Sequence, residues 1–270
     1  MLKDITIGQY FPGQSFLHRM DPRMKIILTI VYIVLLFMAS TLVTIGMSVV
    51  FLAVLYRIAK IPGKMVFRGI KPVIPIVIFT ALLNMLFIDG EVIWKLGFLS
   101  ITKEGLWTAF LMAVRIIALI AGTSLLTYTT SPIVLTDAIE RLMSPLAKLK
   151  FPVHELAMMM TIALRFIPTL IEETDKIMSA QKARGADLES GGLMQRARAL
   201  IPILIPLFIS AFRRADELAL AMECRCYRGG EGRTRMKQLK LGGVDIAAAL
   251  VFCALAAGVI LLNLYLPMPF

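Results

Sequence analysis

Long uncharged runs alternate with short charged joints along most of this chain. Residues 26–56 carry no charged side chain, and as one helix they would measure roughly 46 Å, against about 30 Å for the hydrocarbon core of a bilayer. Arg23 precedes the run and Arg57 follows it. Because Lys and Arg are retained on the cytoplasmic side of a membrane, the run is predicted to be a hairpin of two spans, residues 26–39 and 42–56.

Three further apolar runs predict spans at residues 72–88, 105–130 and 246–266. The first begins after Lys71 and ends before Asp89, so it is expected to run from the cytoplasm outward. The second span then returns the chain, and the third leaves it outside. The pattern predicts a multi-pass membrane protein with five spans, a cytoplasmic N-terminus and an external C-terminus.

Charged residues concentrate between residues 131 and 240, where 17 of the 29 Lys and Arg and 12 of the 18 Asp and Glu lie. The apolar runs of this region, residues 156–164 and 199–212, are too short to span and are expected to be buried or interfacial helix faces. Pro and Gly residues divide the region into three helices. They are expected at about residues 133–147, 153–186 and 193–228.

These elements divide the chain into three regions. The predicted regions are an N-terminal membrane region with four spans (residues 1–130), a cytoplasmic helical region (131–240) and a C-terminal transmembrane helix (241–270). The predicted fold class is therefore an all-α integral membrane protein with about five transmembrane helices and long cytoplasmic helices.

Composition supports this class. Hydrophobic residues make up 58% and charged residues 17% of the chain, with a net charge of +11, which excludes disordered, collagen-like and disulfide-scaffold proteins. Such a basic balance is typical of nucleic-acid and membrane proteins alike. The basic stretch at residues 228–240 directly precedes the last span, so we expect it to anchor lipid headgroups and expect no nucleic-acid partner. The three Cys and two His show no metal-ligand spacing, so no cofactor is expected.

Two of the predicted long helices end in the same way, with an Arg between small residues, nine positions after an Asp. The two runs are Ala183-Arg184-Gly185 and Cys224-Arg225-Cys226. A guanidinium is a rigid planar fork suited to paired hydrogen bonds, and small neighbours let the backbone approach a partner closely. The six residues are therefore candidate contacts with another protein. The alternative is that both arginines only compensate the helix dipole in a last turn.

Several short motifs of the chain resemble those of a known family. They are Gly8-Gln9-Tyr10-Phe11-Pro12-Gly13, Leu17-His18-Arg19-Met20-Asp21-Pro22-Arg23, Thr129-Thr130-Ser131-Pro132, Leu164-Arg165-Phe166-Ile167-Pro168, Ala180-Gln181-Lys182-Ala183-Arg184-Gly185 and the run from Arg213 to Glu223. In order and number, over nearly the whole chain, they resemble the transmembrane T component of energy-coupling factor transporters, the CbiQ-like family.

The resemblance implies a scaffold of the bacterial inner membrane. Such a T component joins two cytoplasmic ABC-type ATPase subunits to an S component, a separate membrane protein that captures a vitamin or a metal ion. The stretch from Gly8 to Arg23 resembles T components shared among many S components more than dedicated ones. The two long helices would be coupling helices, each ending in an alanine-arginine-glycine motif that contacts one ATPase. The first motif is complete here, whereas Cys224 and Cys226 replace the small flanking residues of the second.

Apolar side chains of the long helices are candidate contacts with the S component. They are Leu156, Met158, Met159 and Ile162, together with the run at residues 199–212. Methionine is flexible and polarizable and suits a surface that accepts several partners. The alternative is that these side chains pack the two long helices against each other.

Catalytic and transport classes compete with this interpretation. The sequence has no Gly-x-x-x-x-Gly-Lys-Ser/Thr phosphate loop, so ATP hydrolysis is expected in partner subunits and the chain is expected not to be an enzyme. A stand-alone secondary transporter is the alternative function, but such proteins usually carry acidic groups near the bilayer midplane. The predicted spans hold Arg115, Asn84 and Asn263 and no carboxylate. Arg115 is expected to snorkel or to bond to carbonyls where a helix is broken.

Overall fold

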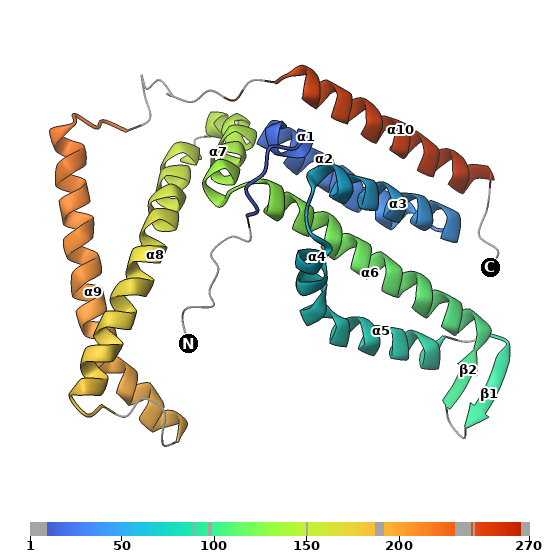
Figure 1. Cartoon of the computed structure of the whole chain (residues 1–270), viewed down its shortest axis with the longest axis horizontal. Helices are drawn as coiled ribbons and strands as arrows, with labels where there is room; N and C mark the ends of the chain where they lie inside the picture. The colour runs from blue at the N-terminus through green and yellow to red at the C-terminus, as the bar shows by residue number, and fades with distance from the viewer. Residues whose placement is uncertain are drawn as a thin grey trace. The chain divides into compact units, whose positions relative to one another are not determined.

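The computed structural model describes residues 10–88, 90–96, 99–149, 151–186, 192–229, 239 and 241–265. These residues form two compact units, whose elements are labelled in Figure 1. The bundle unit comprises residues 10–135 and 239–265, and the helix-pair unit comprises residues 136–229. Gly8 and Gln9 of the first motif, and most of the basic stretch at residues 228–240, lie outside the described residues.

Helices make up most of the bundle unit. In chain order its elements are α1 (Phe16–Arg19), α2 (Pro22–Met38), α3 (Leu42–Ala59), α4 (Gly63–Ile70), the 3-10 turn η2 (Lys71–Val73), α5 (Ile74–Phe87), β1 (Val92–Leu96), β2 (Leu99–Thr102), α6 (Lys103–Thr129) and α10 (Gly243–Tyr265). The predicted all-α membrane class is confirmed. The sequence pattern does not predict α4 or the antiparallel β-hairpin of β1 and β2, in which Leu96 pairs with Leu99.

Local sequence sets several ends of these helices. The carboxylate of Asp21 caps α2 by accepting a hydrogen bond from the Arg23 N–H at 2.9 Å, and Pro22 occupies the first turn, where proline is pre-organised for a helix. Thr41 and Thr44 form a capping box at the start of α3, which satisfies two otherwise orphaned N–H groups. The chain thus leaves the helical conformation between Met38 and Leu42, where the turn of the predicted hairpin is expected.

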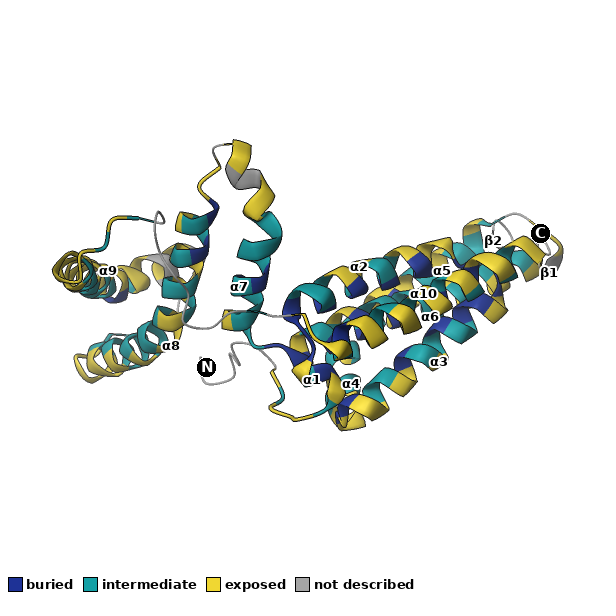
Figure 2. Ribbon diagram, turned by 90° about the horizontal axis from the view of Figure 1, so that it is seen from above, coloured by how far each residue is buried: buried dark blue, intermediate teal, exposed yellow. Residues whose placement is uncertain are grey.

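Three tyrosines link the bundle helices through their hydroxyl groups. The hydroxyls donate to backbone carbonyls of neighbouring helices, Tyr32 to Ser48 at 3.3 Å, Tyr56 to Ala121 at 2.7 Å and Tyr128 to Met65 at 3.1 Å. Gly122 of α6 lets the Tyr32 ring come close, because a Cβ there would lie 2.6 Å from it. The rings belong to a buried apolar core, seen as the dark blue inner faces of the helices in Figure 2. Buried rings with satisfied hydroxyls fix the lateral packing of the bundle.

Two polar side chains from other helices hold the α2–α3 turn. Arg115 of α6 donates from Nη2 to the carbonyl of Ala39. Asn263 of α10 donates from Nδ2 to the Met38 carbonyl at 2.7 Å, and its Oδ1 accepts a hydrogen bond from the Ser40 hydroxyl at 3.1 Å. Carbonyls at a helix C-terminus lack partners within the helix. Arg115 therefore bonds to a carbonyl where a helix is broken, one of its two expected roles.

The α2–α3 hairpin covers only part of the length of α6. Lys25 bonds to the Thr129 carbonyl, and 14 residues separate Lys25 from Ala39, as they separate Thr129 from Arg115. At about 1.5 Å per residue the turn lies roughly 21 Å from this end, less than a hydrocarbon core of about 30 Å. Inside hydrocarbon no water is available to form hydrogen bonds with the backbone of the turn. The side chains of Arg115 and Asn263 form these bonds instead.

Five helices of the described residues are long and apolar enough to cross a bilayer, namely α3, the α4–α5 segment Gly63–Phe87, α6, α8 (Val153–Ala183) and α10. The uncharged run at residues 156–164 is too short to span, but the predicted helix at 153–186 corresponds to α8, which continues through Glu155 and Arg165 for 31 residues. The helix α2, with 17 residues, is not among the five, although it packs within the bundle against α6 and α10.

The described residues of the helix-pair unit form three helices and a 3-10 turn. They are α7 (Pro132–Met143, which enters this unit at Thr136), η3 (Ser144–Leu149), α8 and α9 (Leu193–Cys224). Both long helices continue through internal prolines. His154 of α8 bonds to the Glu140 carboxylate of α7 at 3.1 Å.

The helices α8 and α9 cross in an antiparallel sense (Figure 1). Glu173 of α8 accepts a hydrogen bond from the Ser210 hydroxyl and pairs with Arg214 at 3.0 Å. Further toward the end of α8, Gln181 donates to the Pro202 carbonyl at 3.2 Å. Residue numbers therefore rise along one helix as they fall along the other.

Candidate docking site of the helix pair

The C-terminus of α8 is a hydrogen-bonded Schellman motif. Arg184 is the C-cap, and Gly185 follows with a left-handed backbone at φ +86°. The Gly185 N–H donates to the Lys182 carbonyl and the Ala186 N–H to the Gln181 carbonyl, both at 3.0 Å, as the motif requires. Apart from its chain neighbours, no atom of the residues that the structure describes lies within 4 Å of a Cβ placed on Gly185. Backbone conformation, rather than crowding within this chain, therefore accounts for the glycine.

The C-terminus of α9 repeats this geometry with different residues. Arg225 is the C-cap, and Cys226 takes the left-handed position at φ +56°. The Cys226 N–H donates to the Glu223 carbonyl at 2.8 Å and the Tyr227 N–H to the Met222 carbonyl at 3.0 Å. A non-glycine residue in this conformation costs about 1–2 kcal/mol. The two arginines thus occupy equivalent positions, although one left-handed residue is a cysteine.

All six predicted contact residues are exposed. They are Ala183, Arg184, Gly185, Cys224, Arg225 and Cys226. Within the residues that the structure describes, the two arginine side chains make no hydrogen bond or ion pair. The positions suit a partner contact, and they also suit compensation of the helix dipole. The docking role therefore stays a prediction.

The antiparallel crossing separates the two ends. Because Gln181 lies against Pro202, Arg184 falls near residue 199 of α9. Arg225 is 26 residues further along α9, or roughly 39 Å at about 1.5 Å per residue. The helix-pair unit thus presents two equivalent arginine ends on opposite sides of one crossing.

One face of α9 is an exposed apolar stripe. Its seven members are 45–68% exposed, and they are Leu200, Ile201, Leu204, Ile205, Phe208, Ile209 and Phe212. Their spacing places them on one side of the helix, and Ile203, which points elsewhere, is buried. We call these seven residues the α9 stripe. An exposed apolar surface of this kind marks a contact with a protein or a membrane.

The predicted S-component contacts on α8 divide by exposure. Met159 is exposed, and its neighbour Met160, which the prediction omits, is exposed as well. Leu156, Met158 and Ile162 are only half-buried. Sequence reasoning includes the run at residues 199–212 without separating its faces. The spacing of bulky residues in that run is the signal that defines the α9 stripe.

Comparison with known proteins identifies the family. Residues 13–236 match the CbiQ family model, described as cobalt transport protein. The protein named energy-coupling factor transporter transmembrane protein EcfT of Ruminiclostridium cellulolyticum is 56% identical over 263 residues, which cover 97% of this chain and 98% of that protein. Its namesake of Clostridium kluyveri is 57% identical over 257 residues, 94% of each chain. That of Bacillus subtilis is 46% identical over 258 residues, 95% of this chain and 97% of that protein.

This chain belongs to the CbiQ family. The resemblance stated from the short motifs is confirmed, and the protein is the transmembrane component of an energy-coupling factor transporter. The apolar helices agree with a multi-pass protein of a bacterial membrane.

Motifs that carry the resemblance meet at one end of the bundle unit. The Asp245 carboxylate of α10 accepts hydrogen bonds from the N–H groups of Asp21 and Gly242, both at 2.7 Å. Lys25 donates to the Thr129 carbonyl at 3.0 Å and the Thr130 hydroxyl at 3.2 Å. Two motifs distant in sequence, around Asp21 and Thr129, thereby join the starts of α2 and α10 to the end of α6. The sequence pattern does not indicate this role for Lys25 or Asp245.

Proposed function

We propose that this chain is the non-catalytic scaffold of an ATP-driven importer and that Arg184 and Arg225 each contact one of two ABC-type ATPase subunits. Movement of the ATPases would displace the two ends, and α8 and α9 would transmit it to an S component that binds the vitamin or other micronutrient. The observation that carries the proposal is the repeated C-cap geometry at the two ends of one crossed helix pair. Two equivalent ends suit a motor with two similar subunits.

Substitution of the two arginines tests the ATPase contact. Arginines that anchor an interface typically contribute about 2–4 kcal/mol each, so Arg184→Ala or Arg225→Ala should weaken ATPase binding roughly 30-fold or more. The double variant should lose substrate uptake in whole cells and ATPase subunits in a detergent pull-down. Arg213→Ala is the matched control, because Arg213 is exposed in the middle of α9. Unchanged uptake and co-purification in the double variant would contradict the proposal.

We assign the S-component contact to the α9 stripe together with Met159. The stripe is apolar and exposed, as a surface that packs against a helix of a membrane protein requires. Cysteines at Ile205 or Phe208 should crosslink to an S component, whereas a cysteine at the half-buried Met158 should not. Crosslinks formed only within this chain would favour the alternative that these side chains pack α8 and α9 together.

The helix-pair unit lies in the cytoplasm in this proposal. The distribution of Lys and Arg supports this position, because 17 of 29 lie between residues 131 and 240 and such residues are retained in the cytoplasm. Among the five helices long enough to span, α8 is the least apolar. The orientation places the N-terminus inside and the C-terminus outside.

Polar groups in the membrane helices favour a scaffold over a stand-alone transporter. Arg115 and Asn263 bond to backbone carbonyls of the α2–α3 turn, and Asn84 donates to the Thr80 carbonyl of its own helix at 2.9 Å. Transporter substrate sites usually contain ionisable groups that face a cavity. Here Arg115, Asn263 and Asn84 each donate a hydrogen bond to a backbone carbonyl, although the buried Arg115 Nε has no partner among the described residues.

A further inference from the structure

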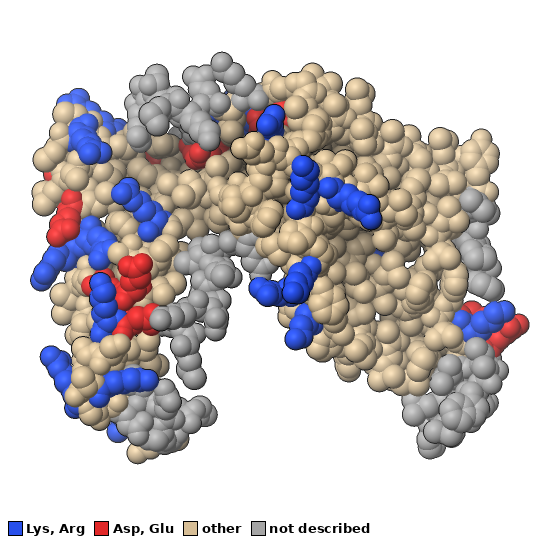
Figure 3. Space-filling model, in the orientation of Figure 1, with Lys and Arg blue, Asp and Glu red and all other residues tan. Residues whose placement is uncertain are grey.

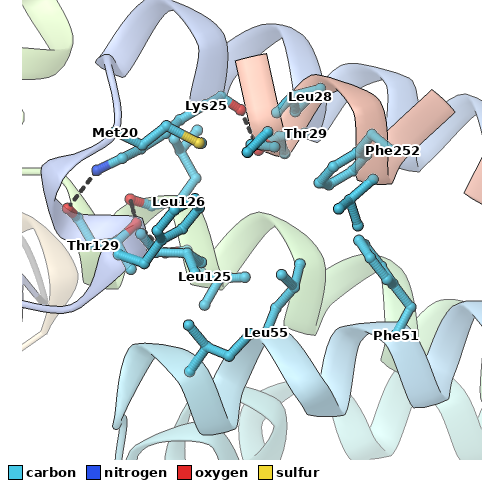
Figure 4. Close-up of a pocket in the computed structure, with 16 residues that line it drawn as sticks. Met20, Lys25, Leu28, Thr29, Phe51, Leu55, Leu125, Leu126, Thr129 and Phe252 are labelled. Atoms are coloured by element: carbon cyan, nitrogen blue, oxygen red, sulfur yellow. Dashed lines mark hydrogen bonds between the residues drawn. The ribbon is translucent and has the colours of Figure 1, made fainter. Parts of the chain in front are cut away.

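An apolar pocket of about 170 Å³ opens in the bundle unit, between α1, α2, α3, α6 and α10. Figure 4 shows its walls, with Leu28 and Phe252 facing Leu55 and Leu125 across the space. The lining lies at the end of the unit that carries Lys25, in the first turns of α2 and α10 and the last turns of α3 and α6. We call this the basic end.

The few polar groups of the wall are already bonded within the protein. The Thr29 hydroxyl donates to the Lys25 carbonyl at 2.7 Å, and the Thr129 hydroxyl donates to the Leu125 carbonyl at 2.8 Å. The Lys25 ammonium, in a residue only 5% exposed, donates to Thr129 and Thr130. A water molecule needs two to four polar partners, and apolar cavities of about 150 Å³ stay dry and take up hydrocarbon. The pocket therefore suits an apolar occupant.

The pocket has an open side toward the surroundings of the bundle. Phe16, Ile58 and Val251 line it and are 42%, 42% and 54% exposed. Between α3 and α10 the rings of Phe51 and Phe252 pack edge to face, with 4.9 Å between their centres, and close the pocket on this side. In a membrane helix bundle the hydrocarbon that reaches such an opening is a lipid acyl chain.

Exposed cations lie beside lining residues at the basic end, where the carboxylates of Asp21 and Asp245 are buried. Arg57 adjoins Ile58, Arg19 adjoins the lining residue Met20, and Lys60 follows at the end of α3; all three cations are exposed. None of them forms an ion pair among the residues that the structure describes. The sequence has no Asp or Glu between Asp21 and Asp89. Figure 3 shows Lys and Arg side chains gathered around α4 at this end, whereas the surface over α2, α3 and α10 is largely uncharged.

We propose that this pocket binds part of one acyl chain of an anionic phospholipid, whose phosphate lies among Arg19, Arg57 and Lys60. The dry apolar lining favours an acyl chain. The exposed cations, which form no ion pair among the described residues, attract the negative headgroup of a lipid in the leaflet at the basic end. The site ties α10 to α2 and α3 through a lipid that the surrounding membrane supplies. This inference depends on insertion of the bundle in a bilayer and not on the ATPase or S-component contacts.

Native mass spectrometry of the detergent-solubilised full chain tests the site. Dioleoyl phosphatidylglycerol and dioleoyl phosphatidylcholine have the same chains and differ in headgroup charge. The wild type should retain one phosphatidylglycerol at least about fivefold more tightly than phosphatidylcholine. Ala248→Phe fills the pocket from α10 and should abolish this retained lipid. The matched control is Ala254→Phe, on the same helix at an exposed position outside the pocket, which should retain it.

Headgroup and chain contacts can be separated by further variants. Arg57→Gln with Lys60→Gln should remove the preference for phosphatidylglycerol, whereas Lys103→Gln, at the far end of α6, should leave it. Val251→Trp should block the open side of the pocket and also abolish the retained lipid. It is the second variant for the test if Ala248→Phe does not fold. Equal retention of the two lipids by the wild type would overturn the proposal. So would undiminished phosphatidylglycerol retention by folded Ala248→Phe or Val251→Trp protein.

Discussion

Gly185 and Cys226 occupy the same left-handed position after two helices, and only glycine suits it without a steric penalty. Their φ values of +86° and +56° explain why the small residue after each arginine matters even in the isolated chain. The requirement comes first from the helix C-terminus. The sequence suggests a second reason for a small residue here, the close approach of a partner protein, and that reason remains a prediction.

Replacing Cys226 with glycine should therefore stabilise the end of α9. We expect a gain of about 1 kcal/mol, because the left-handed strain disappears, measured as slower amide hydrogen exchange in the last turn of α9. Gly185→Ala should have the opposite effect on α8. Cys224→Ala is the control, since Cys224 is the last residue of the helix and has no left-handed backbone. Faster exchange at the end of α9 in Cys226→Gly would contradict this account.

A second residue-scale prediction concerns the two membrane asparagines. Asn263→Leu should lower the melting temperature in detergent, because the Met38 carbonyl and the Ser40 hydroxyl lose their partner. Inside hydrocarbon, where no water can replace the lost partner, an unsatisfied polar group costs at least about 1–3 kcal/mol. Asn84→Leu should have a smaller effect, since Asn84 bonds only to a carbonyl of its own helix. Equal melting temperatures of the two variants would show that the turn does not depend on Asn263.

At the scale of elements, the crossing of α8 and α9 depends on a small polar contact. Glu173 binds Ser210 and Arg214, and the Arg214 guanidinium also lies 5.9 Å from the centre of the Phe166 ring. These groups are only partly exposed, so their interaction is less screened by solvent than that of a surface ion pair. They hold the crossing in register, and the register sets the separation of the arginine ends.

Spin labels at positions 184 and 225 measure that separation. In a background with the three native cysteines replaced by serine, the distance distribution should centre near about 40 Å, from 26 residues of helix at about 1.5 Å each. Arg214→Ala should broaden the distribution, and Arg213→Ala should leave it narrow. A centre below about 25 Å would exclude the antiparallel crossing.

At the scale of the whole molecule, helix length and charge distribution make different predictions about which helices cross the membrane. The helix α8 is long enough to cross, whereas the concentration of Lys and Arg around it predicts a cytoplasmic position. If α8 spans, its two ends lie on opposite sides of the bilayer. If it does not, both ends lie inside.

Labelling with a membrane-impermeant maleimide decides between these topologies. In the cysteine-free background, Glu91→Cys next to the β-hairpin should react in intact cells, whereas Glu155→Cys and Lys176→Cys near the ends of α8 should react only after permeabilisation. All three positions are exposed. Reaction of Lys176→Cys in intact cells would show that α8 crosses the membrane. Protection of Glu91→Cys would reverse the proposed orientation.

Local sequence predicts most elements of this protein because its signals act over short distances. Uncharged runs indicate the membrane helices. Pro and Gly residues predict the ends of the two long helices to within a few residues of the ends observed for α8 (Val153–Ala183) and α9 (Leu193–Cys224). Run length alone does not give the length of α8, because this helix continues through charged residues such as Glu155 and Arg165. The β-hairpin is not predicted although its strands are close in the chain, because the length of an uncharged run indicates a helix and gives no signal for short paired strands.

The sequence by itself determined the family, the all-α membrane class and the two arginine ends, because these depend on composition, run length and ordered short motifs. Tertiary structure alone decided which faces are covered and which ends lie apart. The exposure of the α9 stripe, the wide separation of Arg184 and Arg225, and the contact of Arg115 with Ala39 all depend on contacts between helices distant in the chain. Periodicity shows that a helix has an apolar face, but only packing decides whether that face meets protein, lipid or a partner.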